Sequence, residues 1–277
     1  MPNRRVLITG CSSGVGRALA VRLARRGHEV IASARSAAAV ADLDVADRIG
    51  LDVTDPESVR RAARRLGAVD VLVNNAGRGM RAPVELAGDD DLRALWETNV
   101  LGPVRLIRAF LPAMRERGSG RIVNVSSVAG RRVMPLTGHY AASKHALEAI
   151  GEALRHEVRP FGVEVVTVEP GPVRTEFARN LLAADTTDPG PYREVAEWAA
   201  ELGRAVNAPA QTAEEVADVV VAAVEAERVP LRIPTSPEAA RAIADRTGRG
   251  DTEYEEWLYG VVPPPERPTG GGDAGTR

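Results

Sequence analysis

The sequence predicts a single-domain α/β protein, in which an open, doubly wound parallel sheet carries helices on both faces. Short runs rich in Val and Ile alternate with longer helical stretches along most of the chain, and this alternation is typical of βαβ units. The run at 163–168 reads Val-Glu-Val-Val-Thr-Val. It is mostly apolar, as expected for a strand that is buried on both faces.

The expected elements follow each other in the order that this fold requires. Six strands are expected, at Arg5–Thr9, Glu29–Ala34, Ile49–Val53, Val69–Asn74, Arg121–Ser126 and Val163–Glu169. Five helices are expected between or after them, at Val15–Arg26, Pro56–Leu66, Asp90–Glu116, Gly138–Arg159 and Ala213–Glu227. Local signals support these boundaries, since Asp55 is a candidate N-cap before Pro56 and Gly67 is a candidate stop for the same helix.

Breaks in the pattern fall at the carboxyl ends of the expected strands. They are the loop after Thr9, the run Asn74–Gly77 and the run Glu169–Pro172. Ligands of open α/β sheets bind outside the carboxyl ends of the strands, so these three breaks are expected to surround a binding site.

The composition excludes several classes of protein. The chain has 277 residues and a net charge of −2, so it lacks the basic excess expected of a nucleic-acid-binding surface. No apolar run approaches the ~18 residues of a membrane span, and the run Val6–Ile8 is too short for a signal peptide, so we expect a cytoplasmic protein. Cys11 is the one cysteine, which excludes an internal disulfide. The four histidines lack the spacing of a metal site.

The region after the last expected strand has a different pattern. It predicts a substrate lid of short helices at about 176–212, inserted into a domain that spans 1–262. The tail at 263–277 is rich in Pro and Gly, which predicts disorder. Candidates for the wall of an apolar substrate pocket, or alternatively for a core within the lid, are Met134, Leu136, Phe177, Leu181, Leu182, Tyr192 and Trp198.

The loop Thr9–Gly16 predicts a phosphate-binding site. It follows the first strand and opens the first helix, with glycines at positions 10, 14 and 16. Glycine lets the backbone come close to a ligand, and the N-terminus of a helix attracts a pyrophosphate. The spacing is G-x-x-x-G-x-G, which differs from the G-x-G-x-x-G of the general dinucleotide fingerprint. An ordinary turn between a strand and a helix is the alternative.

The end of the second expected strand favours NADP over NAD. An NAD site usually has an acid here, which bonds the 2′-hydroxyl of the ribose, whereas this chain has Ala34 followed by Arg35. A guanidinium can hold a 2′-phosphate through two hydrogen bonds, and Ser12 or Ser13 could add a hydroxyl. A surface arginine at a strand end is the alternative.

Tyr140 and Lys144 lie four residues apart in an expected helix, so one face carries both side chains. A free phenol has a pKa of ~10, and lowering that pKa to about 7 needs ~4 kcal/mol. One cation at ~4 Å in an effective dielectric of ~20 could supply about that much. Water screens part of this attraction, so a second cation such as an oxidised nicotinamide ring is expected to contribute. Such a pair also occurs by chance on many helices.

Taken together, these motifs resemble those of the short-chain dehydrogenase/reductase family, in its single-domain form with a Rossmann-like fold. The resemblance covers about residues 4–235. Its opening run at 6–14 and the pair Ala34-Arg35 are similar to the branch of hydroxysteroid and retinol dehydrogenases. The matching positions, in chain order, are Thr9–Gly16, Asp52, Asn74–Gly77, Asn99, Ser127, Tyr140 with Lys144, and Pro170-Gly171 with Thr175.

The resemblance implies an NADP(H)-dependent oxidoreductase that interconverts a ketone and a secondary alcohol. Ser127 would orient the carbonyl, and Tyr140 would act as general acid or base. Lys144 would lower the pKa of the phenol and hold the ribose hydroxyls of the nicotinamide. Asn99 would kink a long helix and hold a water that relays protons.

The resemblance also implies where the cofactor binds. Asp52 would accept a hydrogen bond from the adenine, the segment Asn74–Gly77 would pass near the ribose, and Thr175 would hold the carboxamide. The full set of implied cofactor contacts is Gly10, Ser12, Ser13, Gly14, Val15, Gly16, Arg35, Asp52, Val53, Asn75, Ala76, Gly77, Tyr140, Lys144, Pro170, Gly171, Val173 and Thr175.

The family further implies a homodimer or homotetramer formed through the two long helices, and the apolar candidates favour a small apolar ketone or alcohol as substrate. Two alternative functions remain. One is a non-catalytic, dinucleotide-binding regulatory protein, which the presence of Ser127, Tyr140 and Lys144 disfavours. The other is a dehydratase or epimerase on the same fold, which the short C-terminal region disfavours.

Overall fold

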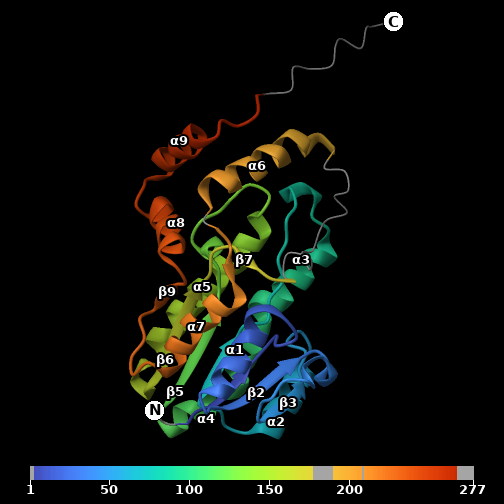
Figure 1. Cartoon of the computed structure of the whole chain (residues 1–277), viewed down its shortest axis with the longest axis vertical. Coiled ribbons are helices and arrows are strands. Elements are labelled where there is room, and N and C mark those ends of the chain that lie inside the picture. The colour runs from blue at the N-terminus through green and yellow to red at the C-terminus, as the bar shows by residue number, and fades with distance from the viewer. Residues whose placement is uncertain (1–2, 177–189, 208, 267–277) are drawn as a thin grey trace, which may run out of the picture.

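A seven-stranded parallel sheet forms the centre of the protein (Figure 1). The computed structural model describes residues 3–176, 190–207 and 209–266. The strands lie in the order β3-β2-β1-β4-β5-β6-β9, and every neighbouring pair is parallel. This order reverses direction between β1 and β4, so the predicted doubly wound sheet is confirmed. The strands are β1 (Arg5–Ile8), β2 (Glu29–Ala34), β3 (Asp47–Gly50), β4 (Val71–Asn74), β5 (Gly120–Val125), β6 (Val163–Glu169) and β9 (Arg232–Pro234).

Helices cover both faces of the sheet. The helices α1 (Gly14–Arg25) and α7 (Ala213–Glu225) pack on one face. The helices α2 (Pro56–Leu66), α4 (Gly102–Arg117) and α5 (Gly138–Val158) pack on the other. No helix within the described residues is long and apolar enough to span a bilayer.

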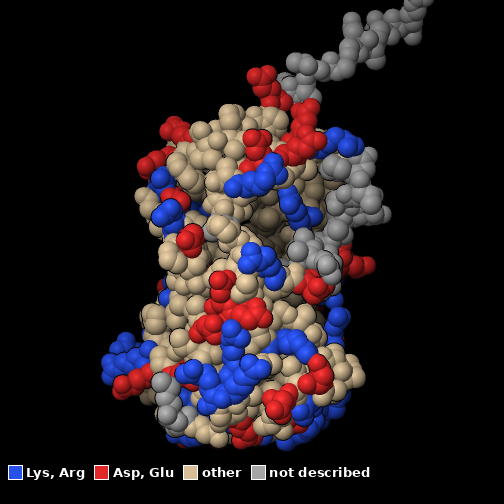
Figure 2. Space-filling model, viewed as in Figure 1, with Lys and Arg blue, Asp and Glu red and all other residues tan. Residues whose placement is uncertain are grey.

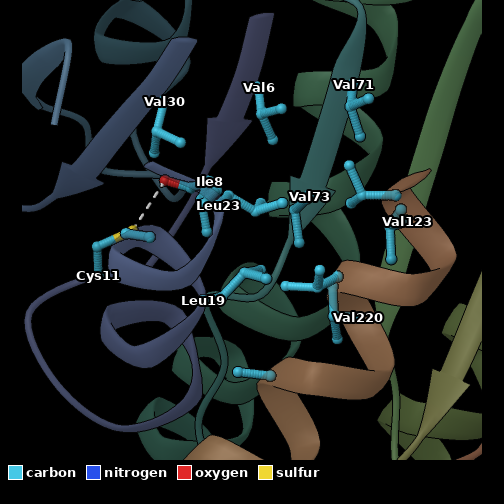
Figure 3. Close-up of a cluster of buried hydrophobic side chains, with 14 of the residues drawn as sticks. Val6, Ile8, Cys11, Leu19, Leu23, Val30, Val71, Val73, Val123 and Val220 are labelled. Atoms are coloured by element: carbon cyan, nitrogen blue, oxygen red, sulfur yellow. Dashed lines mark hydrogen bonds between the residues drawn. The ribbon is translucent and has the colours of Figure 1, made fainter. Parts of the chain in front are cut away.

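The alternation of side chains along β1 determines which residues fill each core. Val6 and Ile8 lie in one cluster with Leu19 of α1 and Val220 of α7 (Figure 3). Leu7 belongs to the cluster on the opposite face, because successive side chains of a strand point to opposite sides. All five side chains are fully buried, and each contributes roughly 1.5–3 kcal/mol to folding.

The third strand ends at Gly50, three residues earlier than expected. Leu51 N still donates to Ala34 O at 2.7 Å, as a continuing strand would. Beyond it, Asp52 Oδ1 accepts hydrogen bonds from Thr54 N at 2.9 Å and Thr54 Oγ1 at 2.8 Å. These local bonds turn the chain away from the sheet, so Asp52 follows the strand instead of lying inside it.

The helix expected at Asp90–Glu116 is not continuous. It consists of α3 (Asp89–Trp96), a π-helical segment at Glu97–Leu101 and then α4. A π-helical segment inserts a local distortion into a helix and frequently occurs at functional sites. Here the segment carries Asn99, at the position where the family resemblance implies a kink.

The two end signals of α2 are confirmed. Asp55 accepts a hydrogen bond from Glu57 N at 2.8 Å, with Pro56 in the first turn. Gly67 ends the helix with a φ of 63°, a conformation that glycine adopts without strain. The elements that were not predicted from the sequence include β9, α8 (Pro237–Thr247) and α9 (Asp251–Val261).

A second, smaller core lies where α6 (Arg193–Val206) packs on α9, at the top of Figure 1. Leu202 of α6 is fully buried there with Leu258 of α9, and Trp198 Nε1 donates to Val262 O at 2.9 Å. The described part of the expected lid is therefore one 14-residue helix, followed by the short strand β8 (Gln211–Thr212), which pairs with β7 (Val173–Arg174). Residues 177–189 of that lid and 267–277 of the tail lie outside the described residues.

A group of buried charges joins α5, β6 and β9. Glu148 and Glu169 are 4% and 1% exposed. Arg232 Nε lies 2.9 Å from Glu148 Oε2 and 3.8 Å from Glu169 Oε1, and Arg131 Nη1 lies 3.6 Å from the same Glu169 oxygen. Burial, and then the nearby Glu148 carboxylate, raise the pKa of Glu169 from 4.5 to about 7. Glu169 therefore holds a proton in mild acid.

We predict that Glu169→Gln flattens the pH dependence of stability. Between pH 4.5 and 7 the folded protein binds the Glu169 proton and the unfolded chain does not. The resulting stability is fully present below about pH 4.5 and is lost as the pH rises through about 7. The loss is at most about 3 kcal/mol.

The amide introduced by Glu169→Gln stays neutral at every pH, so the loss of stability with rising pH should be absent from this variant. Denaturant unfolding at pH 5 and pH 8 measures the effect. Glu152→Gln, which changes a half-exposed carboxylate of the same group, is the matched control and should keep the wild-type dependence. An equal loss of stability in wild type and Glu169→Gln would contradict the prediction.

Candidate functional site

A large cavity lies at the carboxyl ends of the strands. Its volume is about 1640 Å³, and its wall comes from the segments that follow β1 to β6 together with α6. The space-filling view shows the molecule hollowed between α6 and the sheet, with Lys and Arg side chains around the opening (Figure 2). The cavity includes the point where the strand order reverses, which is where open α/β sheets bind their ligands.

The glycine loop after β1 brings backbone N–H groups to this cavity. Gly10 has a φ of +74°, and a Cβ there would lie 2.9 Å from Ala76 Cα. A Cβ on Gly16 would lie 2.4 Å from Gly10 O, so glycine is required at both positions. Ser13 is the N-cap of α1 but makes no side-chain cap hydrogen bond, which leaves the N–H groups of the first turn available to an anion. The loop therefore fits the pyrophosphate of a dinucleotide.

Thr9 ties the ends of β1 and β4 together. Its Oγ1 accepts hydrogen bonds from the N–H groups of Asn75 and Ala76, each at 3.0 Å, and Asn75 Nδ2 donates to Thr9 O at 2.7 Å. Thr9 is 1% exposed. A separate role for Thr9 was not predicted from the sequence, although a threonine that ends an apolar strand was the available signal. These bonds hold the segment after β4 beside the glycine loop.

Arg35 and Asp52 lie on the part of the cavity wall next to β2 and β3. Arg35 follows β2 directly and is exposed. Within the described residues its guanidinium makes no hydrogen bond and no ion pair. One carboxylate oxygen of Asp52 is used by Thr54, and the side chain still lines the cavity. Arg35 is thus a cation at the end of β2 that has no partner among the described residues, and such a cation suits a phosphate ligand.

Ser127, Tyr140 and Lys144 meet on the cavity wall. Ser127 follows β5, whereas Tyr140 lies in the first turn of α5 and Lys144 lies one turn later. The side chain of Ser127 is hydrogen-bonded to Tyr140. Lys144 Nζ lies 5.9 Å from the centre of the Tyr140 ring and donates to Val125 O at 3.0 Å. The arrangement places two hydroxyls and one cation at a single point of the wall.

Burial has the largest effect on the pKa values of Tyr140 and Lys144, the two α5 residues described above. It raises the pKa of Tyr140 to about 12, against a smaller lowering by the hydrogen bond with Ser127. It lowers the pKa of Lys144 to about 8, against a smaller raising by Glu148. The lowering of the Tyr140 pKa that we expected from Lys144 is thus absent in the protein by itself. The cost of burying a phenolate exceeds what an ammonium offers at this separation.

Asn99 lies behind the cavity wall and does not line it. Its Oδ1 accepts from Arg78 N at 2.8 Å, and its Nδ2 donates to Arg78 O at 2.9 Å and to Ser143 Oγ at 3.0 Å. Asn99 is 1% exposed. A Cβ on Gly77 would lie 3.5 Å from Asn99 Oδ1 and 3.7 Å from Lys144 Nζ. Asn99 therefore joins the π-helical segment, the loop after β4 and α5 directly beside Lys144.

The segment after β6 closes the cavity beside the glycine loop. Pro170 O accepts from Val128 N at 2.8 Å, which holds this segment against the one that carries Ser127. A Cβ on Gly14 would lie 3.3 Å from Thr175 Cβ, so Thr175 stands against the first turn of α1. The residues that this segment contributes to the cavity wall include Pro170, Gly171, Val173 and Thr175.

The structure brings the residues named from the sequence into one place, with specific exceptions. All of the expected cofactor contacts line the cavity, as do Ser127, Tyr140 and Lys144. Among the candidates for an apolar pocket wall, Met134 lines the cavity, whereas Leu136, Tyr192 and Trp198 do not. Phe177, Leu181 and Leu182 lie outside the described residues.

Sequence reasoning missed a set of cations on the same wall. They come from three separate segments, and no local pattern links them. Four arginines that line the cavity were not anticipated, namely Arg78, Arg81, Arg132 and Arg204.

Comparisons with known proteins place the chain in a family. The model of the short chain dehydrogenase family matches residues 4–186. Human 17-beta-hydroxysteroid dehydrogenase type 1 is 39% identical over 252 residues, which cover 83% of this chain and 77% of that protein. Retinol dehydrogenase 8 of Bos taurus is 37% identical over 262 residues, which cover 87% of this chain and 84% of that protein.

Comparisons with solved structures support the same family. A short-chain dehydrogenase from Streptomyces avermitilis has a TM-score of 0.77 and 36% identity, and the match covers 92% of this chain and 96% of that one. A short chain dehydrogenase from Burkholderia cenocepacia J2315 in complex with NADP has a TM-score of 0.73 and 28% identity, with 94% and 98% covered. One from Burkholderia phymatum in complex with NAD has a TM-score of 0.74 and 28% identity, with 89% and 93% covered. The chain therefore belongs to the short-chain dehydrogenase/reductase family of oxidoreductases, in the branch that includes hydroxysteroid and retinol dehydrogenases.

Proposed function

We propose that the protein interconverts a ketone and a secondary alcohol with NADP(H), and that Tyr140 is the general acid and base. The observation that carries the proposal is the meeting of Ser127, Tyr140 and Lys144 on the wall of the same cavity into which the glycine loop opens. The related 17-beta-hydroxysteroid dehydrogenase type 1 and retinol dehydrogenase 8 support an alcohol or carbonyl substrate.

The choice of NADP over NAD rests on Arg35. It follows β2 where an NAD site usually has an acid, and its guanidinium has no partner among the described residues. Structural neighbours have been solved with either nucleotide, so they do not favour one over the other. A 2′-phosphate would supply the missing partner of Arg35 through charge-assisted hydrogen bonds.

The chemistry follows from the positions of the protein groups. Bound NADPH would supply the hydride. Ser127 would donate a hydrogen bond to the carbonyl oxygen, and Tyr140 would give its proton to the same oxygen. A Tyr140 pKa of about 12 in the protein alone keeps the phenol protonated, so it is ready to act as the acid in reduction. Oxidation of the alcohol needs the phenolate form of Tyr140. Forming that phenolate requires further positive charge in the cavity.

Lys144 and Asn99 would support this proton transfer. Lys144 Nζ is already oriented by Val125 O, and it would hold the ribose hydroxyls beside Tyr140. Asn99 uses both atoms of its amide in hydrogen bonds with the backbone of Arg78 and with Ser143. We therefore infer that Asn99 orients the loop beside Lys144, and that a relay water reaches Lys144 from that loop.

Exposed apolar side chains near α4 bear on the assembly of the protein. We propose a cytoplasmic homodimer or homotetramer formed through α4 and α5. Trp96 and Leu101, at the start of that helical region, are 39% and 41% exposed, and large exposed apolar side chains favour association.

The proposed activity is tested with a panel of ketones and secondary alcohols, assayed with NADPH and NADP by the absorbance of the reduced nicotinamide. A steady, substrate-dependent change supports a dehydrogenase or reductase. A dehydratase or epimerase would convert substrate with no net change, and a regulatory protein would bind nucleotide without turnover.

Tyr140→Phe should lower turnover by roughly 100-fold or more, because the variant removes the acidic proton and keeps the ring. Nucleotide affinity should stay close to that of the wild type, since the hydroxyl is the one group removed. Steady-state kinetics and fluorescence titration with NADPH measure the two quantities. Turnover near the wild-type rate would remove Tyr140 from the proposed role.

Lys144 should titrate near pH 8 in the protein without nucleotide, against an ordinary value of 10.5. It is the one lysine among the 36 Lys and Arg residues of the chain, so lysine labelled with nitrogen-15 gives a single Nζ resonance to follow by NMR. A midpoint at or above pH 10 would contradict the burial of the ammonium.

The lowered pKa of Lys144 also predicts that the stability of the protein rises with pH. Between pH 8 and 10.5 the unfolded chain holds the Lys144 proton and the folded protein does not, so the free energy of unfolding should increase across this window. Lys144→Met, which has no charge to lose, should lack that increase.

Arg35→Asp should shift the cofactor preference toward NADH. Hydrogen bonds to a charged group contribute about 1.5–3 kcal/mol each, so the ratio of kcat/KM for NADPH to that for NADH should fall by at least about 10-fold. Arg228→Asp, which changes an exposed arginine away from the cavity, is the matched control. A wild-type preference for NADH would show that Arg35 does not select the cofactor.

A further inference from the structure

Besides Arg35, the cavity that holds Tyr140 is lined by arginines from three segments. Arg78 and Arg81 follow β4, Arg132 follows β5, and Arg204 lies on α6. We name these four residues the arginine wall. The loops that carry them are tied together, because Ala82 N donates to Leu136 O at 2.9 Å. Figure 2 shows Lys and Arg side chains gathered around the same hollow.

The charges of the arginine wall are not neutralised by the protein. Among the described residues, none of the four has a carboxylate within ion-pair distance, and Arg78, Arg81 and Arg204 make no side-chain hydrogen bond. Arginines elsewhere behave differently, for example Arg22 and Arg26 on α1, which pair with Asp218 and Glu225.

The acids that line the cavity have other partners. Glu97 Oε2 lies 2.6 Å from Arg105 Nη1. Asp52 belongs to the part of the wall next to β3 and accepts hydrogen bonds from Thr54. Neither acid forms an ion pair with the arginine wall in the described part of the chain, so the lining of the cavity carries an excess of positive charge.

The burial of Arg132 makes the excess of positive charge in the cavity energetically unfavourable. It is 2% exposed. Its Nη2 donates to Asn207 Oδ1 and its Nη1 to Val206 O at 3.4 Å, while Nε has no hydrogen-bond partner in the described structure. A buried cation without a counter-ion destabilises the fold, and a bound anion relieves that cost.

We propose that the substrate carries a carboxylate as well as the reacting carbonyl or hydroxyl group, and that the arginine wall binds this carboxylate while Tyr140 and Ser127 hold the carbonyl. The proposal rests on the oxidoreductase function proposed above and names its class of substrate: an oxo acid, reduced to the corresponding hydroxy acid. The overall reaction is R–CO–R′–COO⁻ + NADPH + H⁺ → R–CHOH–R′–COO⁻ + NADP⁺. The hydride joins carbon, the proton joins oxygen, and the carboxylate is unchanged.

The carboxylate requirement also revises the expectation of an apolar substrate. Among the described candidates for an apolar pocket wall, Met134 alone lines the cavity, but other apolar residues such as Pro135 and Ala199 line it too. These residues can contact the carbon chain between the two functional groups. Arginine binds a carboxylate through two parallel hydrogen bonds, and three of the four wall residues have all of their donors available.

The test compares isosteric acids and amides. The reactive probes are 5-oxohexanoate, 7-oxooctanoate and 9-oxodecanoate, each with its primary amide. The unreactive probes are octanoate and octanamide, and their binding to the NADP-saturated protein is measured by calorimetry. At least one oxo acid should show a kcat/KM about 10-fold or more above that of its amide, and octanoate should bind at least about 10-fold more tightly than octanamide.

Substitutions then test whether the arginine wall causes the preference for the acid over the amide. Arg78→Gln, Arg81→Gln and Arg204→Gln, combined in one variant, should bring acid and amide to similar values and leave NADPH affinity unchanged. These side chains make no hydrogen bond in the described structure, so the variant should fold. Arg228→Gln removes the same kind of charge from an exposed position off the cavity and should retain the preference for the acid. Increasing ionic strength should weaken that preference in the wild type.

The outcomes separate the two proposals. If acids and amides react and bind equally well, the carboxylate inference is overturned and the oxidoreductase function stands. If octanoate binds more tightly than octanamide through the arginine wall but no ketone is turned over, the carboxylate site stands and the proposed reaction fails. A preference for the acid that survives the triple variant would also overturn the assignment to these arginines.

Discussion

The burial of Lys144 beside Tyr140 is the constraint on which the site depends. The lowering of the Lys144 pKa from 10.5 to about 8 corresponds to a cost on the order of 3 kcal/mol for the charged form. Val125 O offsets part of that cost by accepting from Nζ at 3.0 Å, so α5 must lie close against β5 and β6. Gly151 permits this approach, because a Cβ there would lie 3.0 Å from Thr167 Oγ1. Packing of α5 on the sheet and placement of the ammonium are therefore the same requirement.

A second requirement is that the loop after β4 reaches the same point from the other side. Thr9 holds its beginning through the N–H groups of Asn75 and Ala76, and Asn99 holds its continuation at Arg78. The π-helical segment that carries Asn99 places an amide where a regular helix would present a different residue. In this way one local irregularity in a helix connects the loop after β4 to α5.

The sheet and most of the site could be predicted from the sequence because their signals are local. Apolar strands, the glycine loop and the Tyr140/Lys144 spacing each occupy a short stretch of chain. The arginine wall could not be predicted, because the tertiary fold brings Arg78, Arg132 and Arg204 to the wall of one cavity and nothing in the sequence links them. The same holds for β9, three residues that become a strand by pairing with β6. The raised Tyr140 pKa was also missed, since spacing alone does not report desolvation.

The distribution of charge in the cavity connects these features to substrate choice. Arg35 follows β2, the arginine wall comes from the segments after β4 and β5 and from α6, and the acids on the cavity wall are engaged by Thr54 or Arg105. A cleft with an excess of one sign concentrates ligands of the opposite sign and speeds their association. Burial raises the pKa of the Tyr140 phenol to about 12, so the phenol stays protonated at neutral pH in the protein alone. A neutral acid in a cavity with an excess of cations suits a reaction in which both ligands arrive as anions and the proton moves only when they are in place.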